Sequence, residues 1–304
     1  MNSIKNFLKK LFYVEKVSGV PFGVTHLFGL KIRWNPDQTP VADVIAKQVA
    51  REVYSVMEVQ YLHNRVFPQF KNINKDKDVV IYGCGPTLKY YNNEISGEKI
   101  ALNKAILLDN VDFQYSFCID ANLLKTCPNY LEIIQEKKNC ISFVGKPLHP
   151  ERKQFPETNF AEDSQCYRFY EAGREAMPSR DFGKILYPNL ENHPLANFES
   201  VAFSALHFAF YTHPKRIYFV GLDTSSGHFF DKSGSYEVNS MMEGYHLFEN
   251  FAQLYYPDVE IISVNPVGLK GLFTDVYTKS YVDEHPELLK ENVKIIESEN
   301  CNAE

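Results

Sequence analysis

Short apolar runs alternate with helical stretches over most of this chain, and this alternation constrains the fold more than any other feature. The runs lie near residues 79–83, 99–102, 114–119, 140–144, 216–221 and 259–264. Stretches with helical periodicity lie between several of them, at 87–94, 121–137, 198–212 and 238–256. Strands that alternate with helices pair in parallel and are covered on both faces. The sequence therefore predicts an α/β fold with a Rossmann-like, doubly wound, mostly parallel sheet.

The composition excludes several classes of protein. The 304 residues are 44% hydrophobic and 23% charged, which suits a folded chain with a large core. A net charge of -6 without a dense Lys/Arg tract argues against a nucleic-acid binder. The six cysteines form no CxxC, and the histidines show no HxxxH spacing. We therefore expect reduced thiols, a cytoplasmic protein and metal-independent chemistry.

The pattern along the chain predicts three regions. Residues 1–70 form a leader with a hairpin at 24–36 and a long amphipathic helix at 40–66. Residues 71–280 form the main domain, and residues 281–304 form a C-terminal tail. Within the main domain the rhythm breaks at 145–197, which predicts a small lobe or long loops over one end of the sheet.

The first residues carry apolar side chains at helical spacing with lysines on the flank: Phe7, Leu8, Leu11 and Phe12, beside Lys5, Lys9 and Lys10. Such a helix could rest on anionic lipid at the inner face of the cell membrane. A helix packed on its own domain and a frayed tail are the alternatives. No apolar run approaches the roughly 20 residues that span a bilayer, and no signal peptide is evident.

Ligands of an open parallel sheet collect where the strands end. The first strong run ends in Gly83-Cys84-Gly85-Pro86-Thr87. The glycines allow a tight turn and close backbone approach, Pro86 loses no N–H at a helix start, and Thr87 offers a hydroxyl. This turn predicts an anion site, with a purely structural strand-to-helix turn as the alternative.

Two further strand ends carry polar residues. Asn103 follows the run at 99–102, where its amide can donate and accept at once, although a turn or cap is the alternative. The run at 216–221 leads into Asp223 and a hydroxyl-rich turn, Thr224-Ser225-Ser226-Gly227-His228. This turn predicts a substrate loop, with a surface turn capped by Asp223 as the alternative.

The order of these motifs resembles a known family. Gly-x-Gly-Pro-Thr-Leu after the first strand, an Asn about 18 residues later and a late strand ending in Gly-Leu-Asp are similar to the bacterial sialyltransferases of glycosyltransferase family 42. The related motility-associated-factor glycosyltransferases share the pattern. The likeness covers about residues 78–275 and includes "NFESVAFSALHFAFYTHPKRIYFVGLD" and "SVNPVGLKGLF". It implies a sialyltransferase-like variant of the GT-A fold.

The resemblance also implies roles for single residues. A CMP-linked sugar donor would be held by Gly83, Cys84, Gly85, Pro86, Thr87, Asn103, Asp120, Ser200, Ser225 and Ser226. A lid over residues 224–245 would order over the donor, and Asp223 would position the lid or the acceptor.

Two positions depart from the family pattern. Ser225 and residues near 229–231 stand where the family has lid tyrosines, and its general-base His aligns near Met241. His228 is our first candidate for the base and His246 the second, because a side chain that titrates near pH 6.5 suits this task. For His246, packing on its helix is the alternative.

The implied activity is inverting transfer of a sialic-acid-like sugar from a CMP donor onto a bacterial surface glycan such as lipooligosaccharide or capsule. The expected partners are this donor and a glycan acceptor, with no other cofactor and no nucleic acid; self-association into a homo-oligomer fits the family. Two alternatives stay open: a diphosphate-transferring or other nucleotide-dependent enzyme on the same fold, and a non-catalytic, nucleotide-binding assembly partner.

Overall fold

The structure is a computed structural model that describes residues 12–16, 23–27, 30–34, 57–147, 160, 165–173, 186–224 and 238–296. The chain divides into two compact units, residues 1–58 and 59–304. The first contains an antiparallel sheet of β1 (Phe12–Lys16), β2 (Gly23–Leu27) and β3 (Leu30–Trp34). The β2–β3 hairpin is the one predicted at 24–36. Phe12 belongs to β1 rather than to the amphipathic helix that we predicted, and residues 1–11 lie outside the described residues.

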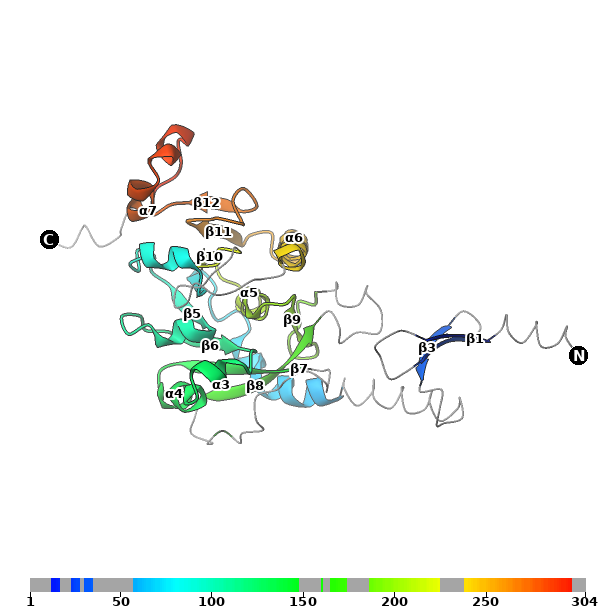
Figure 1. Ribbon diagram of the computed structural model, residues 1–304. Helices are drawn as coiled ribbons and strands as arrows, with labels where there is room; N and C mark the ends of the chain where they lie inside the picture. The colour runs from blue at the N-terminus through cyan, green and yellow to red at the C-terminus, as the bar shows by residue number, and fades with distance from the viewer. Residues whose placement is uncertain are drawn as a thin grey trace, which may run out of the picture. The chain divides into compact units, whose positions relative to one another are not determined.

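The second unit is built on a nine-stranded sheet in the order β12-β11-β10-β4-β5-β6-β7-β8-β9, with every pair parallel (Figure 1). From β4 the chain adds strands outward to β9, then returns to the other side of β4 to place β10, β11 and β12. The predicted doubly wound α/β fold is therefore confirmed, and its topological switch point lies between β4 and β10. The strands are β4 (Asp78–Tyr82), β5 (Glu98–Leu102), β6 (Tyr115–Cys118), β7 (Ile141–Pro147), β8 (Cys166–Gly173), β9 (Leu195–Asn197), β10 (Arg216–Val220), β11 (Glu260–Val264) and β12 (Thr274–Val276).

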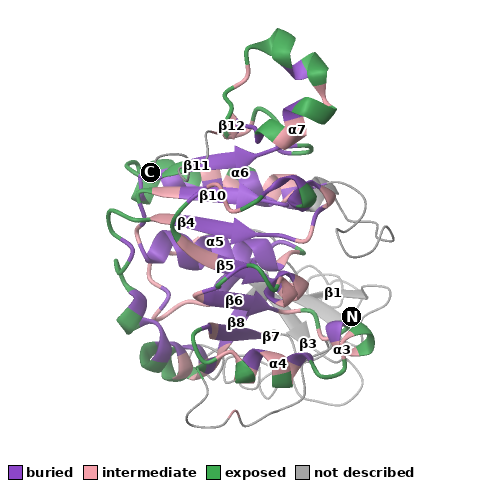
Figure 2. Ribbon diagram, turned by 90° about the vertical axis from the view of Figure 1, so that its left-hand side faces the viewer, coloured by how far each residue is buried: buried purple, intermediate pink, exposed green. Residues whose placement is uncertain are grey.

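Both faces of the sheet are buried at its centre, which explains why the central strands β4 and β10 are apolar after their first residue (Figure 2). Successive strand residues face opposite cores: Val79 and Ile81 pack in one, and Val80 and Tyr82 in the other. The first core includes residues of α5 (Val201–Tyr211) and α6 (Val238–Tyr255). The second includes residues of η2 (Pro86–Tyr90), η3 (Asn103–Leu107), α3 (Leu123–Thr126) and α4 (Tyr130–Glu136).

The stretch at 145–197 differs from the small lobe that we predicted. Its described parts include β8 and β9, which extend the sheet beyond β7. Residues 148–159, 161–164 and 174–185 lie outside the described residues. The helical stretch predicted at 121–137 is also interrupted, because Cys127-Pro128-Asn129 separates α3 from α4.

The boundaries of the second unit enclose residues that we assigned to the leader and the tail. Of the long helix predicted at 40–66, residues 57–66 are described and helical. Val66, Phe67 and Phe70 pack in the core beside α5 and α6. At the other end, α7 (Lys279–Glu284) and η5 (Pro286–Glu291) follow β12. None of the helices described here is long and apolar enough to cross a membrane.

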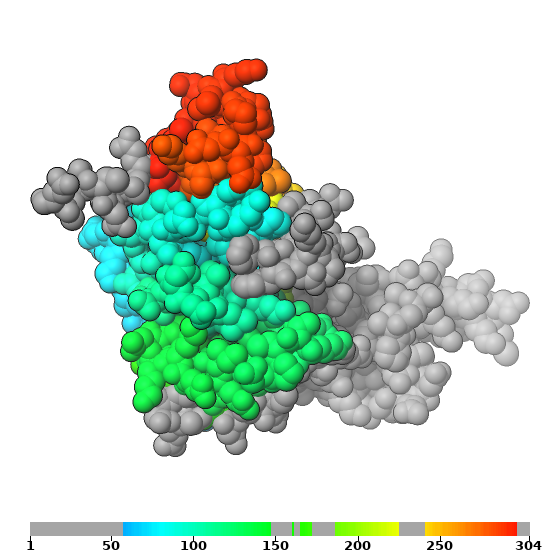
Figure 3. Space-filling view, turned by 60° about the vertical axis from the view of Figure 1, so that its left-hand side comes forward, coloured from blue at the N-terminus to red at the C-terminus, as the bar shows by residue number. Residues whose placement is uncertain are grey.

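The C-terminal residues pack against η2, as the red and cyan segments of Figure 3 show. The Ser280 hydroxyl donates to the Tyr90 carbonyl at 2.6 Å, and the Tyr90 hydroxyl donates to the Glu284 carboxylate at 2.5 Å. The rings of Tyr90 and Tyr281 meet edge to face. This packing joins the last described helices to the element that follows β4.

Two buried histidines fasten the segment at 186–197 to the rest of the unit. The Nδ1–H of His63 donates to the Leu190 and His193 carbonyls at 2.8 and 3.0 Å, while Nε2 accepts the Tyr170 amide at 2.8 Å. His207 donates through Nε2 to the Tyr187 carbonyl and accepts the Ala196 amide on Nδ1. Each ring therefore uses one nitrogen as donor and the other as acceptor, which only the neutral form can do. Burial lowers the pKa of each histidine to about 4.

Acid should therefore destabilise the fold through these two rings. The unfolded chain takes up their protons below about pH 6.5, whereas the folded protein does so only near pH 4, so stability falls between these values. At pH 5 the expected loss relative to neutral pH is roughly 2 kcal/mol for each histidine. Urea unfolding of wild type and His63→Gln at pH 7.5 and pH 5 measures it. His63→Gln should lose about half of the pH dependence attributed to the pair; equal pH dependence in wild type and His63→Gln would contradict this account.

Candidate functional site

At the switch point, the turns that follow β4 and β10 lie so close together that Gly83 and Gly85 have no room for a side chain. The Gly83 amide donates to the Val220 carbonyl at 2.8 Å, and the Gly85 amide donates to the Gly221 carbonyl at 2.7 Å. A Cβ atom on Gly83 would lie 2.2 Å from the Gly221 oxygen, and one on Gly85 would lie 2.6 Å from the Asp223 carboxyl carbon. Glycine is therefore required here by the approach of one chain segment to another.

The carboxylate of Asp223 closes the same turn. It accepts the Thr87 amide at 2.8 Å and the Thr87 hydroxyl, and the Asp223 residue is 4% exposed. Burial raises the pKa of Asp223, and the two Thr87 hydrogen bonds offset part of that rise. The amides of Gly83, Gly85 and Thr87, which we predicted to hold a phosphate, are thus engaged within the protein. The turn serves first to join β4 to β10.

A cavity of about 280 Å³ lies at the carboxyl ends of the central strands. It is lined by the ends of β4, β5, β6 and β10, by the start of α5 and by α6. Pro86 and Thr87 are not among the lining residues, and Ser225, Ser226 and His228 lie outside the described residues. The predicted residues that line the cavity are Gly83, Cys84, Gly85, Asn103, Asp120, Ser200 and Asp223.

The first turn of α5 faces this cavity. Ser200 caps the helix by accepting the Ala202 amide on its Oγ at 3.2 Å. The next residue, Val201, lines the cavity, and its amide has no carbonyl one turn earlier within the helix. The aligned amides of an 11-residue helix place partial positive charge at this end. This part of the cavity therefore suits an anionic group.

Three buried polar atoms among the lining residues lack a hydrogen-bond partner in the described part of the chain. They are Asn103 Oδ1, Thr224 Oγ1 and the Tyr245 hydroxyl. Buried polar groups are almost always paired, so several orphans around one cavity indicate a place for a ligand. Sequence reasoning identified Asn103 but missed Tyr245, because Tyr245 lies in an apolar stretch of α6 that indicated only packing.

The described lining is acidic. It contains the carboxyl groups of Asp120, Glu199 and Asp223 and no Lys, Arg or His. Asp120 is exposed and accepts the backbone and side-chain amides of Asn122. Glu199, also exposed, precedes the helix cap with a left-handed φ of 64°, and sequence analysis gave no signal for it. Cys84 donates its thiol to the Leu102 carbonyl, and burial raises its pKa to about 11, so it is a poor nucleophile.

His246 lies outside this lining. It is exposed on α6, and its Nδ1 is 3.6 Å from the Glu249 carboxylate. Met241 on α6, near which the base of the resembled family aligns, does line the cavity. Within the described ranges, no group of three or more His, Cys, Asp or Glu side chains is placed to hold a metal ion.

The loop after β11 supports the Asp223–Thr224 segment from behind. The Gly268 amide donates to the Asp223 carbonyl at 2.8 Å, and a Cβ on Gly268 would lie 2.5 Å from the Thr224 carbonyl oxygen. Asn265 in turn is fixed by hydrogen bonds with Thr278. The "SVNPVGLKGLF" motif therefore positions the cavity wall.

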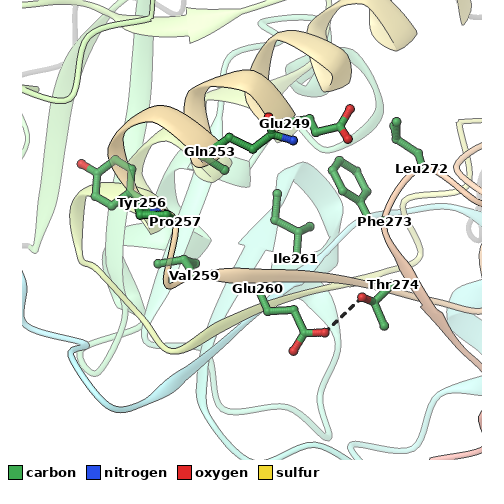
Figure 4. A pocket seen from close by; sticks show the side chains of 11 residues that line it. Glu249, Gln253, Tyr256, Pro257, Val259, Glu260, Ile261, Leu272, Phe273 and Thr274 are labelled. Carbon is green, nitrogen blue, oxygen red and sulfur yellow. Dashed lines mark hydrogen bonds between the residues drawn. The ribbon is translucent and has the colours of Figure 1, made fainter.

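A larger hollow of about 450 Å³ lies elsewhere, between the end of α6 and the beginnings of β11 and β12 (Figure 4). Tyr256, Ile261 and Phe273 line it, and the Thr274 hydroxyl donates to Glu260 across its edge at 3.0 Å. It opens at the amino ends of these strands, and no partnerless buried polar atom of the described residues lines it. The cavity at the switch point is therefore the better candidate.

The chain is thus an α/β protein with a cavity at the switch point of a doubly wound parallel sheet. No protein-family model and no curated protein matches the chain. Among solved structures, the chain is similar to two variants of the sialyltransferase CST-II in complex with CMP. The first gives a TM-score of 0.43 at 14% identity and covers 75% of this chain and 90% of that one. The second gives a TM-score of 0.42 at 14% identity and covers 75% of this chain and 89% of that one. The structure of CstII from Campylobacter jejuni with the substrate analogue CMP-3FNeuAc gives a TM-score of 0.41 at 14% identity and covers 75% of this chain and 89% of that one. At these values the similarity concerns the course of the chain alone.

Removing the Thr87 hydroxyl should weaken the fold rather than only the site. In Thr87→Val the buried Asp223 carboxylate loses one of its two hydrogen bonds, which should cost roughly 1–3 kcal/mol of unfolding free energy. Urea denaturation measures this loss. The exposed Thr126→Val serves as the control and should stay within about 0.5 kcal/mol of wild type. Equal stability of both variants would show that the Thr87–Asp223 contact does not hold the turn.

Proposed function

We propose that this protein is a glycosyltransferase that takes a sugar from a nucleotide donor, most simply a CMP-linked sialic-acid-like sugar. The observation that carries the proposal is the cavity at the switch point. Six residues that the motif resemblance assigned to donor binding, from Gly83 to Ser200, line one cavity although they are up to 117 residues apart in sequence. This location is where open α/β sheets bind their ligands.

The polarity of the cavity suggests how the donor lies in it. The phosphate belongs beside Ser200 and the Val201 amide, where the helix dipole favours negative charge. Asn103 offers a buried Oδ1 that can accept a hydrogen bond from a ribose hydroxyl or a base amine. The carboxyl groups of Asp120 and Glu199 suit the hydroxyls of the sugar, since each carboxylate oxygen accepts hydrogen bonds.

Transfer needs a base that removes a proton from the acceptor hydroxyl as its oxygen attacks the anomeric carbon and the nucleotide leaves. His228 remains our first candidate and His246 the second. The exposed position of His246 outside the lining favours His228 of the two. Asp223 would act as a positioning residue, because its carboxylate is already engaged by Thr87.

The acceptor and the setting belong to the same proposal. A bacterial surface glycan such as lipooligosaccharide or capsule is the expected acceptor, and the enzyme would work in the cytoplasm at the inner face of the membrane. Residues 1–17 would provide the lipid contact. Self-association remains part of the proposal.

Binding of nucleotides separates this proposal from its alternatives. In thermal-shift measurements with CMP, UDP, GDP and ATP, we expect CMP to stabilise the protein without added metal. Asn103→Ala should weaken CMP binding by about 10-fold, since it removes one buried hydrogen-bonding side chain. Asn110→Ala is the matched control, because Asn110 is exposed and lies outside the lining. Dependence on Mg²⁺ and ATP would favour diphosphate transfer instead, and binding of no nucleotide would favour an assembly partner.

The base is tested by turnover. The double variant His228→Ala/His246→Ala should lower CMP release from CMP-sialic acid in the presence of a glycan acceptor by at least about 100-fold. The single variants assign the role: we expect most of the loss in His228→Ala. Near-normal turnover in the double variant would refute both assignments and direct attention to the lining carboxyl groups of Asp120 and Glu199.

A further inference from the structure

We infer that Tyr245 and Thr224 form a hydroxyl pair that donates hydrogen bonds to an anionic oxygen of the bound ligand, beside the first turn of α5. The chemical nature of that ligand, a nucleotide phosphate, rests on the proposed function. The hydroxyl pair itself is derived from burial, contacts and missing partners in the described residues.

Packing fixes the position of Tyr245. The residue is 1% exposed, and its ring centroid lies 4.7 Å from that of Phe203 in the first turn of α5 and 6.0 Å from that of Phe219 near the end of β10. Gly244 allows this approach, since a Cβ there would lie 2.7 Å from the Phe203 ring. The side chain of Tyr245 is therefore held between the helix start and the strand end that frame the cavity.

Thr224 reaches the same wall from β10. It is 8% exposed and has a left-handed φ of 47°, a conformation that β-branched residues rarely adopt. The segment is fixed from behind through Gly268, whose amide binds the Asp223 carbonyl. Thr224 and Tyr245 both line the cavity.

Apart from their contact with each other, the two hydroxyls are buried without a hydrogen-bond partner in the described part of the chain. Leaving a buried hydroxyl unpaired costs about 1–3 kcal/mol. Two such hydroxyls on one wall of the cavity therefore indicate that a ligand pairs with them. They lie beside each other, and the Thr224 hydroxyl offsets part of the rise in the pKa of Tyr245 that burial causes. Tyr245 therefore keeps its proton at neutral pH and can donate it.

The neighbouring groups select the charge of the ligand. The Val201 amide at the start of α5 is a donor, and Ser200 has a hydroxyl proton to donate while its oxygen accepts the Ala202 amide. Together with the hydroxyls of Tyr245 and Thr224, they make four groups that line the cavity and can donate a hydrogen bond. An oxygen with negative charge satisfies several donors at once, whereas a neutral hydroxyl cannot.

Removing these hydroxyls should affect binding and stability in opposite ways. In the full-length protein without ligand, Tyr245→Phe and Thr224→Val should keep or raise the melting temperature, because each removes a buried hydroxyl whose one contact in the described residues is the other hydroxyl of the pair. Both should weaken CMP binding by about 10-fold, while leaving any binding of cytidine, which lacks the phosphate, unchanged. Valine is also β-branched, so Thr224→Val leaves the backbone preference at this position unaltered.

Tyr211→Phe is the matched control. Tyr211 is as buried as Tyr245, but its hydroxyl donates to Glu191 at 2.8 Å and the residue lies outside the lining. This variant should lower the melting temperature and leave CMP binding unchanged.

Several results would overturn the inference. If Tyr245→Phe loses as much stability as Tyr211→Phe, its hydroxyl has a partner within the protein. If wild type and Tyr245→Phe bind CMP equally, the hydroxyl does not touch the phosphate, although the proposed function stands. If wild type binds inorganic phosphate but not CMP, and Tyr245→Phe weakens that binding, the inference stands and the proposed function fails. Binding of neither CMP nor phosphate by wild type contradicts both.

Discussion

The parallel pairing of β4 with β10 is the contact on which the rest of this structure depends. The two strands are 138 residues apart in sequence, and polar contacts fix both ends of their pairing. At the amino end, Arg216 binds Asp78 with two parallel hydrogen bonds of 2.9 and 2.5 Å. At the carboxyl end, Asp223 binds Thr87. Because the chain departs from this pair in opposite directions, the crevice above it is left open for a ligand.

The sequence predicted those parts of the fold in which one residue type dominates a stretch. Six strands follow continuous apolar runs, and both long helices of the second unit, α5 and α6, follow their periodicity. The strands β9 and β12 were missed because three residues give no pattern, and β8 because Arg168 and Glu171 interrupt its apolar residues. The 3-10 geometry of η2 was also beyond prediction, because a segment of five residues does not reveal its helix type.

The candidate site also has parts that the sequence predicted and parts that it did not. Residues at strand ends were predictable as a group, since topology alone brings the ends of parallel strands to one edge. Their individual contacts were not. A glycine can be required by a ligand, by backbone conformation or by another chain segment, and sequence does not distinguish these causes. At Gly83 and Gly85 the cause is another chain segment, namely the residues that follow β10. The amides that pattern alone assigned to a phosphate therefore serve the fold.

Because the amides after β4 are engaged within the protein, the helix start that can attract an anion is that of α5 rather than that of η2. The start of η2 is already neutralised by the Asp223 carboxylate, and a second anion beside it would be repelled. The start of α5 has only the Ser200 side chain as a cap, so part of its dipole is still available to a ligand. Two helical starts thus face one small cavity, and only one can accept negative charge from outside. In the proposed complex the phosphate of the donor therefore lies at the Ser200 and Val201 donors, and the hydroxyls of its sugar lie at the carboxyl groups of Asp120 and the exposed Glu199.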